Sequence, residues 1–380
     1  MLRALFSIGF RPFFLAAGWL AAAWILLWIT YLHGGWPDLG GLSPILWHGH
    51  EMLFGFTAAV IAGFVLTAVQ NWTGLPSTTP ASLGTLVGVW ALARLGFLFP
   101  ELVPLWLTSI ADLAFFPLLG AMMTRVLLKA ENHRNYAFIP LFAAFSVLNL
   151  LMHLEFHELV AGVGMPAMQI TVYLVTVLLV FMGGRVIPFF TSRRLPQLNV
   201  RQWPWLNWAS TLSVLAVIPA YLALGRSPAL APVLLIAAML TLARLLAWQP
   251  WSTWRVPMLW ILHLSYFWIP LGLLAQAAHL LGFGVSWSMG VHALMVGAMG
   301  GLCLGMMARV SLGHSGRPLE AHPLIAVSFG LIVLATASRL LMAVPGSPAW
   351  LMGGSAVLWA SAFVLFAAYY TPILLTPRQA

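Results

Sequence analysis

Charged residues are scarce in this sequence. Only 7% of its 380 residues are Asp, Glu, Lys or Arg, whereas 62% are hydrophobic. Soluble domains carry about 25% charged and about 45–50% apolar residues, so this chain has too few polar groups to cover a surface in water. The composition excludes an ordinary soluble globular protein and indicates that the solvent of the chain is lipid.

Cysteine and acidic residues are also rare. The single cysteine, Cys303, excludes an internal disulfide framework and the cysteine clusters of zinc ribbons and iron–sulfur sites. Eight acidic residues against 17 basic ones give a net charge of +9. The basic residues lie between the apolar runs instead of forming one basic patch, which argues against a nucleic-acid partner. Any metal in this protein is therefore expected to be bound by histidines.

Long continuous apolar runs dominate the chain. A bilayer span needs about 20 mostly apolar residues, and continuous rather than alternating runs predict helices rather than a barrel. The loops are short and rich in Pro, Gly and Trp, so we predict one transmembrane domain over residues 1–380, an all-α bundle of about twelve spans. The expected spans are 12–32, 46–69, 81–98, 102–124, 136–156, 163–190, 204–224, 228–247, 257–281, 287–311, 322–343 and 348–372.

The basic residues predict the orientation of the spans. Cytoplasmic loops carry an excess of Lys and Arg, and a cytoplasmic N-terminus leaves only Arg94, Arg226 and Arg339 outside. We therefore expect a multi-pass membrane protein with both termini in the cytoplasm and lipid as its main contact. The residues on the cytoplasmic side are then Arg3, Arg11, Arg125, Lys129, Arg134, Arg193, Arg194, Arg201, Arg255, Arg317 and Arg378.

The spans show a pattern of internal repetition. His50, Gly55, Gly63 and Gly74 match His292, Gly297, Gly305 and Gly316 at a constant offset of 242 residues, since 292 lies 242 after 50. The sixth span matches the tenth at an offset of 124 through Arg185, Arg193, Arg309 and Arg317. The hypothesis that follows is three units of four helices.

Four histidines are expected at one depth near the outer face: His48, His50, His153 and His292. Imidazole is a common ligand of haem iron and of copper, so metal ligation is one interpretation; capping of helix ends or contact with interfacial water is the other. His48 and His50 are two residues apart and point about 200° away from each other on a helix. His263 and His314 lie toward the opposite side.

Three mid-span charges are expected to lie near enough to a helix end to reach water: Asp112, Arg185 and Arg244. Arg185 and Arg309 could pair with haem propionates, anionic lipid or helix carbonyls. Gly297, Gly301 and Gly305 recur every fourth residue. They form either a surface for close helix packing or a flat wall for a porphyrin.

At these residues the sequence resembles the NnrS family of bacterial nitric-oxide-response membrane proteins. The resemblance rests on stretches in order along nearly the whole chain. It implies a polytopic protein of a bacterial inner membrane that binds haem and copper and protects against nitrosative stress; it implies no secure reaction or electron donor. The matching stretches are Gly9 to Phe14, Trp47 to Phe56, Asn71 to Gly74, Gly183 to Thr191, and His292 through Arg309 to Arg317.

A weaker resemblance is to haem–copper oxidases and nitric-oxide reductases, whose twelve helices form three four-helix arcs. In those enzymes histidines on the second and tenth helices hold a low-spin haem. His48, followed by Gly49 and Met52, resembles their second-helix pattern, whereas the internal repeat favours His50. The sequence lacks their histidine pairs on the sixth and seventh helices, so their copper centre is not implied.

The ligand assignment follows from the repeat and the depth of the histidines. We expect haem b, because no Cys-x-x-Cys-His motif is present for covalent attachment, with His50 and His292 as axial ligands. His48 and His153 are then the copper ligands, with His263 and His314 in reserve. The predicted function is nitric-oxide defence by redox chemistry or gas binding, so an enzymatic activity stays open. The alternatives are a polytopic transporter and a non-catalytic sensor or assembly factor.

Overall fold

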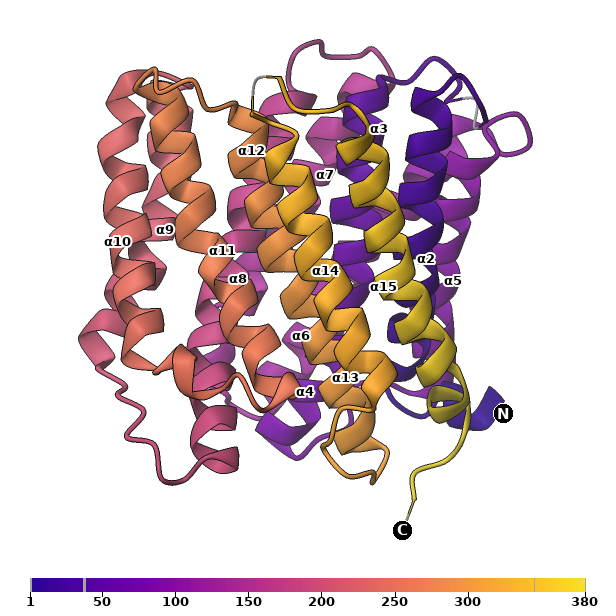
Figure 1. Ribbon diagram of the computed structural model, residues 1–380. Coiled ribbons are helices and arrows are strands. Elements are labelled where there is room, and N and C mark those ends of the chain that lie inside the picture. Colours follow the sequence, from indigo (N-terminus) through magenta and orange to yellow (C-terminus); the bar gives the residue numbers. More distant parts are fainter. Residues whose placement is uncertain (1, 37–38, 345, 380) are drawn as a thin grey trace. The chain divides into compact units, whose positions relative to one another are not determined.

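The computed structural model describes residues 2–36, 39–344 and 346–379 and is helical throughout, with no strand in these ranges (Figure 1). Within them, twelve helices are long and apolar enough to cross a membrane. The chain is therefore an all-α, multi-pass membrane protein, and the predicted fold class is confirmed.

The observed spans follow the predicted ones closely, with ends that agree to within five residues. Proline helps to set these boundaries: helices begin at Pro44, Pro80, Pro204, Pro257 and Pro323, because proline fits the first turn, where its missing N–H is not needed. The spans are Phe10–Leu32, Pro44–Thr73, Pro80–Leu98, Leu105–Lys129, His133–Phe156, Gly164–Arg194, Pro204–Leu224, Pro228–Ser252, Pro257–Leu280, Trp287–His314, Pro323–Leu341 and Trp350–Leu375.

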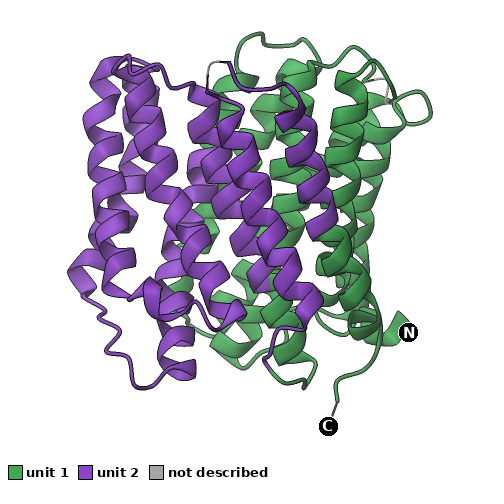
Figure 2. Ribbon diagram, in the orientation of Figure 1, with its two compact units in different colours: residues 1–171, 307–318, 363–380 green, residues 172–306, 319–362 purple. Residues whose placement is uncertain are grey.

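The chain divides into two compact units, coloured separately in Figure 2. Unit 1 comprises residues 1–171, 307–318 and 363–380, and unit 2 comprises residues 172–306 and 319–362. Three helices contribute to both units: α8 (Gly164–Arg194), α13 (Gly301–His314) and α15 (Trp350–Leu375). The single domain expected from the sequence stays a prediction.

Unit 1 is built mainly from the first five spans. Helix α6 packs against both α5 and α7, and α2 packs against α4. The core between them is strongly aromatic, with Phe13, Phe54, Phe115 and Phe116 all buried. The helices are α2 (Phe10–Leu32), α3 (Pro44–His50), the π-helix η1 (Glu51–Thr57), α4 (Ala58–Thr73), α5 (Pro80–Leu98), α6 (Leu105–Lys129) and α7 (Phe138–Phe156), preceded by the short α1 (Leu2–Leu5).

Unit 2 contains most of the remaining spans. Helix α10 packs between α9 and α11, while α11 also packs on α12 and η5. Glycines allow some of these contacts: Trp268 lies on Gly297 and Trp359 on Gly300. At each glycine an indole ring fills the space that a side chain would need. The helices are α9 (Pro204–Leu224), α10 (Ala231–Ala247), α11 (Pro257–Leu280), α12 (Trp287–His292), the π-helix η5 (Ala293–Gly300) and α14 (Pro323–Leu341).

The two π-helices repeat at the offset that the sequence indicates. Helix η1 begins at Glu51, directly after His50, and η5 begins at Ala293, directly after His292; 293 lies 242 residues after 51. Helices α5 and α14 correspond at both ends with an offset of 243. π-Helices are rare and often occur at functional sites. Their shared position supports the repeat hypothesis for the second and tenth spans, although α8, in the sixth, is α-helical throughout.

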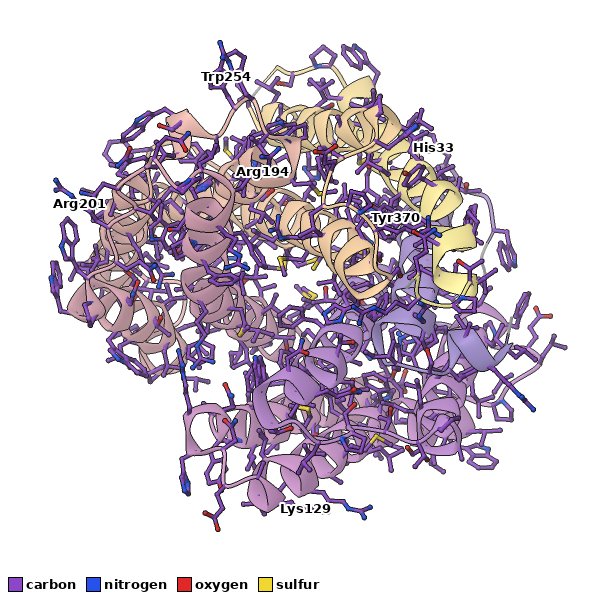
Figure 3. The ribbon with its side chains drawn as sticks, turned by 90° about the horizontal axis from the view of Figure 1, so that it is seen from below. His33, Lys129, Arg194, Arg201, Trp254 and Tyr370 are labelled. Atoms are coloured by element: carbon purple, nitrogen blue, oxygen red, sulfur yellow. The ribbon has the colours of Figure 1, made fainter. Side chains whose placement is uncertain are left out.

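Basic and tryptophan side chains lie at the outer edges of their own units. Lys129, the last residue of α6, projects outward from unit 1 in Figure 3, and Arg201 and Trp254 project outward from unit 2. Trp203 lies beside Arg201 and is 41% exposed. Exposed Arg and Trp side chains of this kind are typical of the headgroup level of a membrane.

Candidate metal centre

A cluster of buried polar side chains crosses the interior of unit 1. It brings together side chains from five elements: α2, the α3–η1 junction, α5, α6 and α7. All of its central members are buried among apolar residues. Buried polar and charged groups are costly unless they are paired, so an assembly of this size in a membrane span needs a reason. Its members are Trp24, His50, Glu51, Arg94, Ser109, Asp112, Asn149 and His153.

His50 lies at the centre of this cluster, between two carboxylates. Its Nδ1 is 3.1 Å from Glu51 Oε1, and its Nε2 is 3.1 Å from Asp112 Oδ2 and 3.0 Å from Asn149 Oδ1. The π-helix begins at the next residue, so the backbone widens where His50 and Glu51 enter the cluster. Trp90 Nε1 donates to the carbonyl oxygen of Gly55 at 2.9 Å, which satisfies a π-helix carbonyl.

Asp112 joins the helices that surround His50. Its Oδ1 accepts a hydrogen bond from Arg94 Nη2, and its Oδ2 accepts one from Asn149 Nδ2 at 2.7 Å. His153 Nε2 is 3.0 Å from the same Oδ2. Arg94 reaches both carboxylates, since its Nη1 donates to Glu51 Oε1 at 2.5 Å. Arg94 therefore holds α5, η1 and α6 together.

Each imidazole lies between hydrogen-bonding partners, and a neutral ring has only one N–H to donate. His50 has a carboxylate at each ring nitrogen, Glu51 at Nδ1 and Asp112 at Nε2, so a neutral His50 donates to one carboxylate and turns a lone pair toward the other. When Ser109 donates its one proton to Leu105 O at 2.8 Å, its oxygen, 2.9 Å from His153 Nδ1, accepts from that nitrogen. With Nδ1 protonated in both rings, as metal binding at the centre requires, the lone pairs lie on the Nε2 atoms of His50 and His153.

These assignments leave an excess of acceptors at the centre. The Nε2 atoms of His50 and His153 face Asp112 Oδ2, and His50 Nε2 also faces Asn149 Oδ1. The ligand atoms of His50, Asp112 and His153 lie within 4.8 Å of one another. Lone pairs at such distances repel unless a proton or a cation lies among them. This arrangement can bind a metal ion or one additional proton.

The charges of the cluster lead to the same conclusion. Glu51 and Asp112 contribute two negative charges and Arg94 one positive charge, which leaves one negative charge with both imidazoles neutral. An unbalanced buried charge is expensive. The cluster is neutral when it takes up one unit of positive charge.

Aromatic side chains enclose His50. The rings of Phe97, Phe54 and Phe156 lie 4.9, 5.1 and 5.4 Å from the imidazole, between ring centroids. These contacts exclude bulk water and leave His50 fully buried. On its outer side the cluster continues through Ser109 to His157, whose Nε2 is 2.8 Å from Ser109 Oγ. His157 is only half-buried, so this side leads toward the surface of unit 1.

Of the six histidines proposed as ligands, the structure brings together His50 and His153. His48 points elsewhere and stacks on Trp28, with ring centroids 4.5 Å apart. His314 lies at the other end of unit 1, 5.7 Å from the ring of Phe10.

The remaining predicted residues have other surroundings. His263 and His292 belong to unit 2. His263 Nε2 is 2.9 Å from Thr191 Oγ1, and His292 Nδ1 is 2.7 Å from Ser288 O. Arg185 lies over the ring of Phe181 at 4.0 Å, and Arg309 is buried near the end of α13.

Asp112 and Arg244 are buried, so the prediction that they reach water was wrong. Asp112 is only 3% exposed and Arg244 only 2%. Asp112 is held by Arg94 and Asn149, and Arg244 donates to Tyr266 Oη and to the carbonyl of Val180. Internal partners replace water, so neither side chain extends to a helix end.

Arg94, Ser109 and Asn149 were missed as members of the site. The sequence contained a signal for them: Ser109 and Asp112 are three residues apart on one helix, and Asn149 and His153 are four apart on the next. Such spacings place each pair on one face. Polar faces on consecutive spans, with an arginine on the span before them, predict a shared buried site.

Comparison with known families identifies the chain. The family model described as "NnrS protein" matches residues 4–378. The chain belongs to the NnrS family. The family predicted from its motifs is confirmed, and the matched region covers all twelve spans of this NnrS protein, including every residue of the buried cluster. No curated protein matches the chain in a sequence search.

Proposed function

We propose that this NnrS protein binds copper through His50, Asp112 and His153 and acts with haem in the nitric-oxide response of a bacterial inner membrane. The single observation that carries the proposal is that two imidazole Nε2 atoms lie 3.1 and 3.0 Å from one carboxylate oxygen, Asp112 Oδ2. Imidazole nitrogen suits copper. The family resemblance supports copper as the metal and nitric oxide as the molecule to which the protein responds.

The residues present fit a copper ion in both donor chemistry and charge. Each imidazole presents a lone pair at Nε2 when its Nδ1 proton is donated, to Glu51 from one ring and to Ser109 from the other. Such outer hydrogen bonds fix the ring orientation in most histidine metal sites. Copper(I) neutralises the single negative charge of the cluster, whereas a divalent ion leaves one positive charge. A bound copper ion supplies one-electron redox chemistry and a binding place for small gaseous ligands.

The fit for haem is better at His292 than at His50. His50 is held at both ring nitrogens and enclosed by three phenylalanine rings, which favours it as a member of the metal centre. His292 Nδ1 donates to a backbone carbonyl, so Nε2 is the lone-pair nitrogen, as an axial haem ligand requires. We therefore propose His292 as a haem ligand; the pairing of Arg185 and Arg309 with propionates stays a prediction from the sequence.

Metal analysis of the purified protein tests this function. We expect about one copper per chain after expression with ample copper and haem. Two histidines and a carboxylate are also a donor set for non-haem iron, so copper, iron and zinc are measured together, with haem iron quantified separately by absorbance. Asp112→Asn and His153→Ala should lose the copper.

His263→Ala is the matched control, because His263 is an equally buried histidine with a neutral hydrogen-bond partner. It should keep the copper. Copper retained at the wild-type ratio in both Asp112→Asn and His153→Ala would refute the proposed ligands. A properly folded protein without any bound metal would favour the carrier or sensor alternatives.

A further inference from the structure

Two sequence stretches of the family resemblance, Gly9 to Phe14 and Gly313 to Arg317, meet at the end of unit 1 away from the metal centre. Phe10 and His314 form the ring contact between them. The end of the chain joins both: Arg11 Nη1 donates to Leu374 O at 2.8 Å and to Thr376 O, and Gln379 N donates to Ser315 O at 3.0 Å. Three segments thus enclose one region.

This region holds an unusual number of buried polar atoms without a partner. Among the described residues, no hydrogen-bond partner is present for Arg11 Nε, Arg317 Nε, Ser311 Oγ or Ser315 Oγ. Arg11 is only 2% exposed, and both serines are buried. A serine on a helix usually bonds to the carbonyl four residues earlier, which makes the orphaned hydroxyl of Ser311 notable. Buried polar atoms normally have partners.

Positive charge accumulates in the same place. Arg317 lies close enough to Arg11, and Arg378 close enough to His314, for their charges to act on each other. No carboxylate forms an ion pair with Arg11, Arg317 or Arg378 in the part of the chain that the structure describes. Carbonyls at the end of α15 offset part of the charge of Arg11, but they use only its Nη1.

Guanidinium N–H groups and hydroxyls are the donors with which proteins bind phosphate, and here several of them lie at one helix end without an internal acceptor. Gly316, with a φ of +73°, turns the chain directly after Ser315, and the last residues of the chain pack against this turn. Arg11 is 13 residues from Trp24, which contacts the metal centre. At 1.5 Å per residue this is about 20 Å along α2, so the two sites are separate.

We propose that Arg11, Ser311, Ser315 and Arg317 form a binding site for a phosphate group. The group is either inorganic phosphate or the headgroup phosphate of an anionic lipid, which present the same oxygens to the same donors. The site lies at the ends of α2, α13 and α15, and binding there ties both chain ends of unit 1 to the tenth span. It is separate from the proposed copper site at the other end of unit 1.

Thermal unfolding of the purified full chain tests the site, because a ligand that binds only the folded state raises the unfolding midpoint. One arm titrates inorganic phosphate in a neutral detergent against chloride at matched ionic strength. The other arm compares nanodiscs of phosphatidylcholine with nanodiscs that also contain phosphatidylglycerol. We expect at least one of the two to raise the midpoint, and the arm that responds identifies the source of the phosphate.

Variants separate a specific site from general effects of phosphate on stability. Ser311→Ala and Arg317→Gln each remove one donor and should weaken the apparent affinity about tenfold, the effect of losing one hydrogen bond to a charged group. Arg193→Gln removes an exposed charge in unit 2 and should change nothing. The proposal is overturned if neither phosphate source stabilises the wild type, or if Ser311→Ala and Arg317→Gln respond like Arg193→Gln. Ser311→Ala removes only a hydroxyl, so the test holds even if Arg317→Gln fails to fold.

Discussion

Arg94 stabilises the buried cluster because it is the one cation between two carboxylates. It donates to Glu51 and to Asp112 from opposite arms of its guanidinium. Arg94 offsets one of the two negative charges, so one added positive charge makes the cluster neutral. The three side chains depend on one another for this balance of charge. Replacing such a buried ion pair with apolar residues of the same shape costs little stability. Removing only one partner destabilises the fold strongly, because it leaves a buried charge without its partner.

Replacing Arg94 with methionine should therefore destabilise the protein strongly. The change leaves two buried carboxylates without their cation, for which the typical cost is about 3–5 kcal/mol. Thermal unfolding in detergent measures the loss. Adding Asp112→Asn and Glu51→Gln to Arg94→Met should recover much of it, since the unpaired charges are removed together. A triple variant no more stable than Arg94→Met would show that packing, not charge, causes the loss.

Ser109 would orient His153 in a metal site without being a ligand. Its oxygen is 2.9 Å from His153 Nδ1, and when it accepts the proton of that nitrogen, Nε2 faces Asp112 with its lone pair. We expect Ser109→Ala to retain the copper site but to bind copper about 10–100-fold more weakly, the usual effect of losing such an outer hydrogen bond. Competition with a copper chelator measures the affinity. Unchanged affinity in Ser109→Ala would mean that the ring is held by other contacts.

The π-helix η1 is the element that places His50 and Glu51 side by side in the cluster. Gly55 lies within it, next to Arg94: a Cβ on Gly55 would come 2.8 Å from Arg94 Nη1 and 3.4 Å from Glu51 Oε2. Arg94 is held at both ends by carboxylates and cannot move aside freely. The glycine is therefore required by close approach rather than by an unusual backbone angle.

Gly55→Ala should accordingly perturb both stability and copper binding. Gly88 provides the control, because it lies within α5 and a Cβ there would meet nothing within 4 Å. In an exposed helix position, alanine is favoured over glycine by about 0.8–1.0 kcal/mol, so Gly88→Ala should be neutral or stabilising. Equal unfolding midpoints and equal copper contents for the two variants would contradict the role of Gly55.

How far the sequence predicts these elements depends on the kind of interaction. Span positions follow from local composition, and proline sets several starts, so 204–224 is predicted to the residue. The π-helices are not predictable in this way, because the extra residue in the turn depends on tertiary partners such as Trp90. The sequence pattern did indicate related positions after His50 and His292. Asp112 was misplaced because depth along a helix says nothing of a partner on the next helix.

For the whole molecule, twelve spans place both chain ends on one side of the membrane, and the basic residues favour the cytoplasm as that side. Reporter proteins fused after Ala380 and within residues 34–42 should therefore give opposite answers, with the C-terminal reporter cytoplasmic. Alkaline phosphatase and green fluorescent protein fusions read the two sides. Reporters that place both positions on the same side would contradict the number of spans and the depth assigned to His50.

The proposed nitric-oxide defence would depend on the metal-loaded protein in its membrane, so it needs a test in cells. A strain that lacks its own NnrS protein and carries the wild-type gene should grow better under a nitric-oxide donor than the same strain with an empty vector. Asp112→Asn should lose this advantage because it removes the carboxylate at which both histidines meet. His48→Ala should keep it, since His48 stacks on Trp28 outside the cluster, and membrane levels of the variants must be equal. If Asp112→Asn protects the strain as well as the wild type does, the buried cluster has no part in the nitric-oxide response, even if copper is bound there.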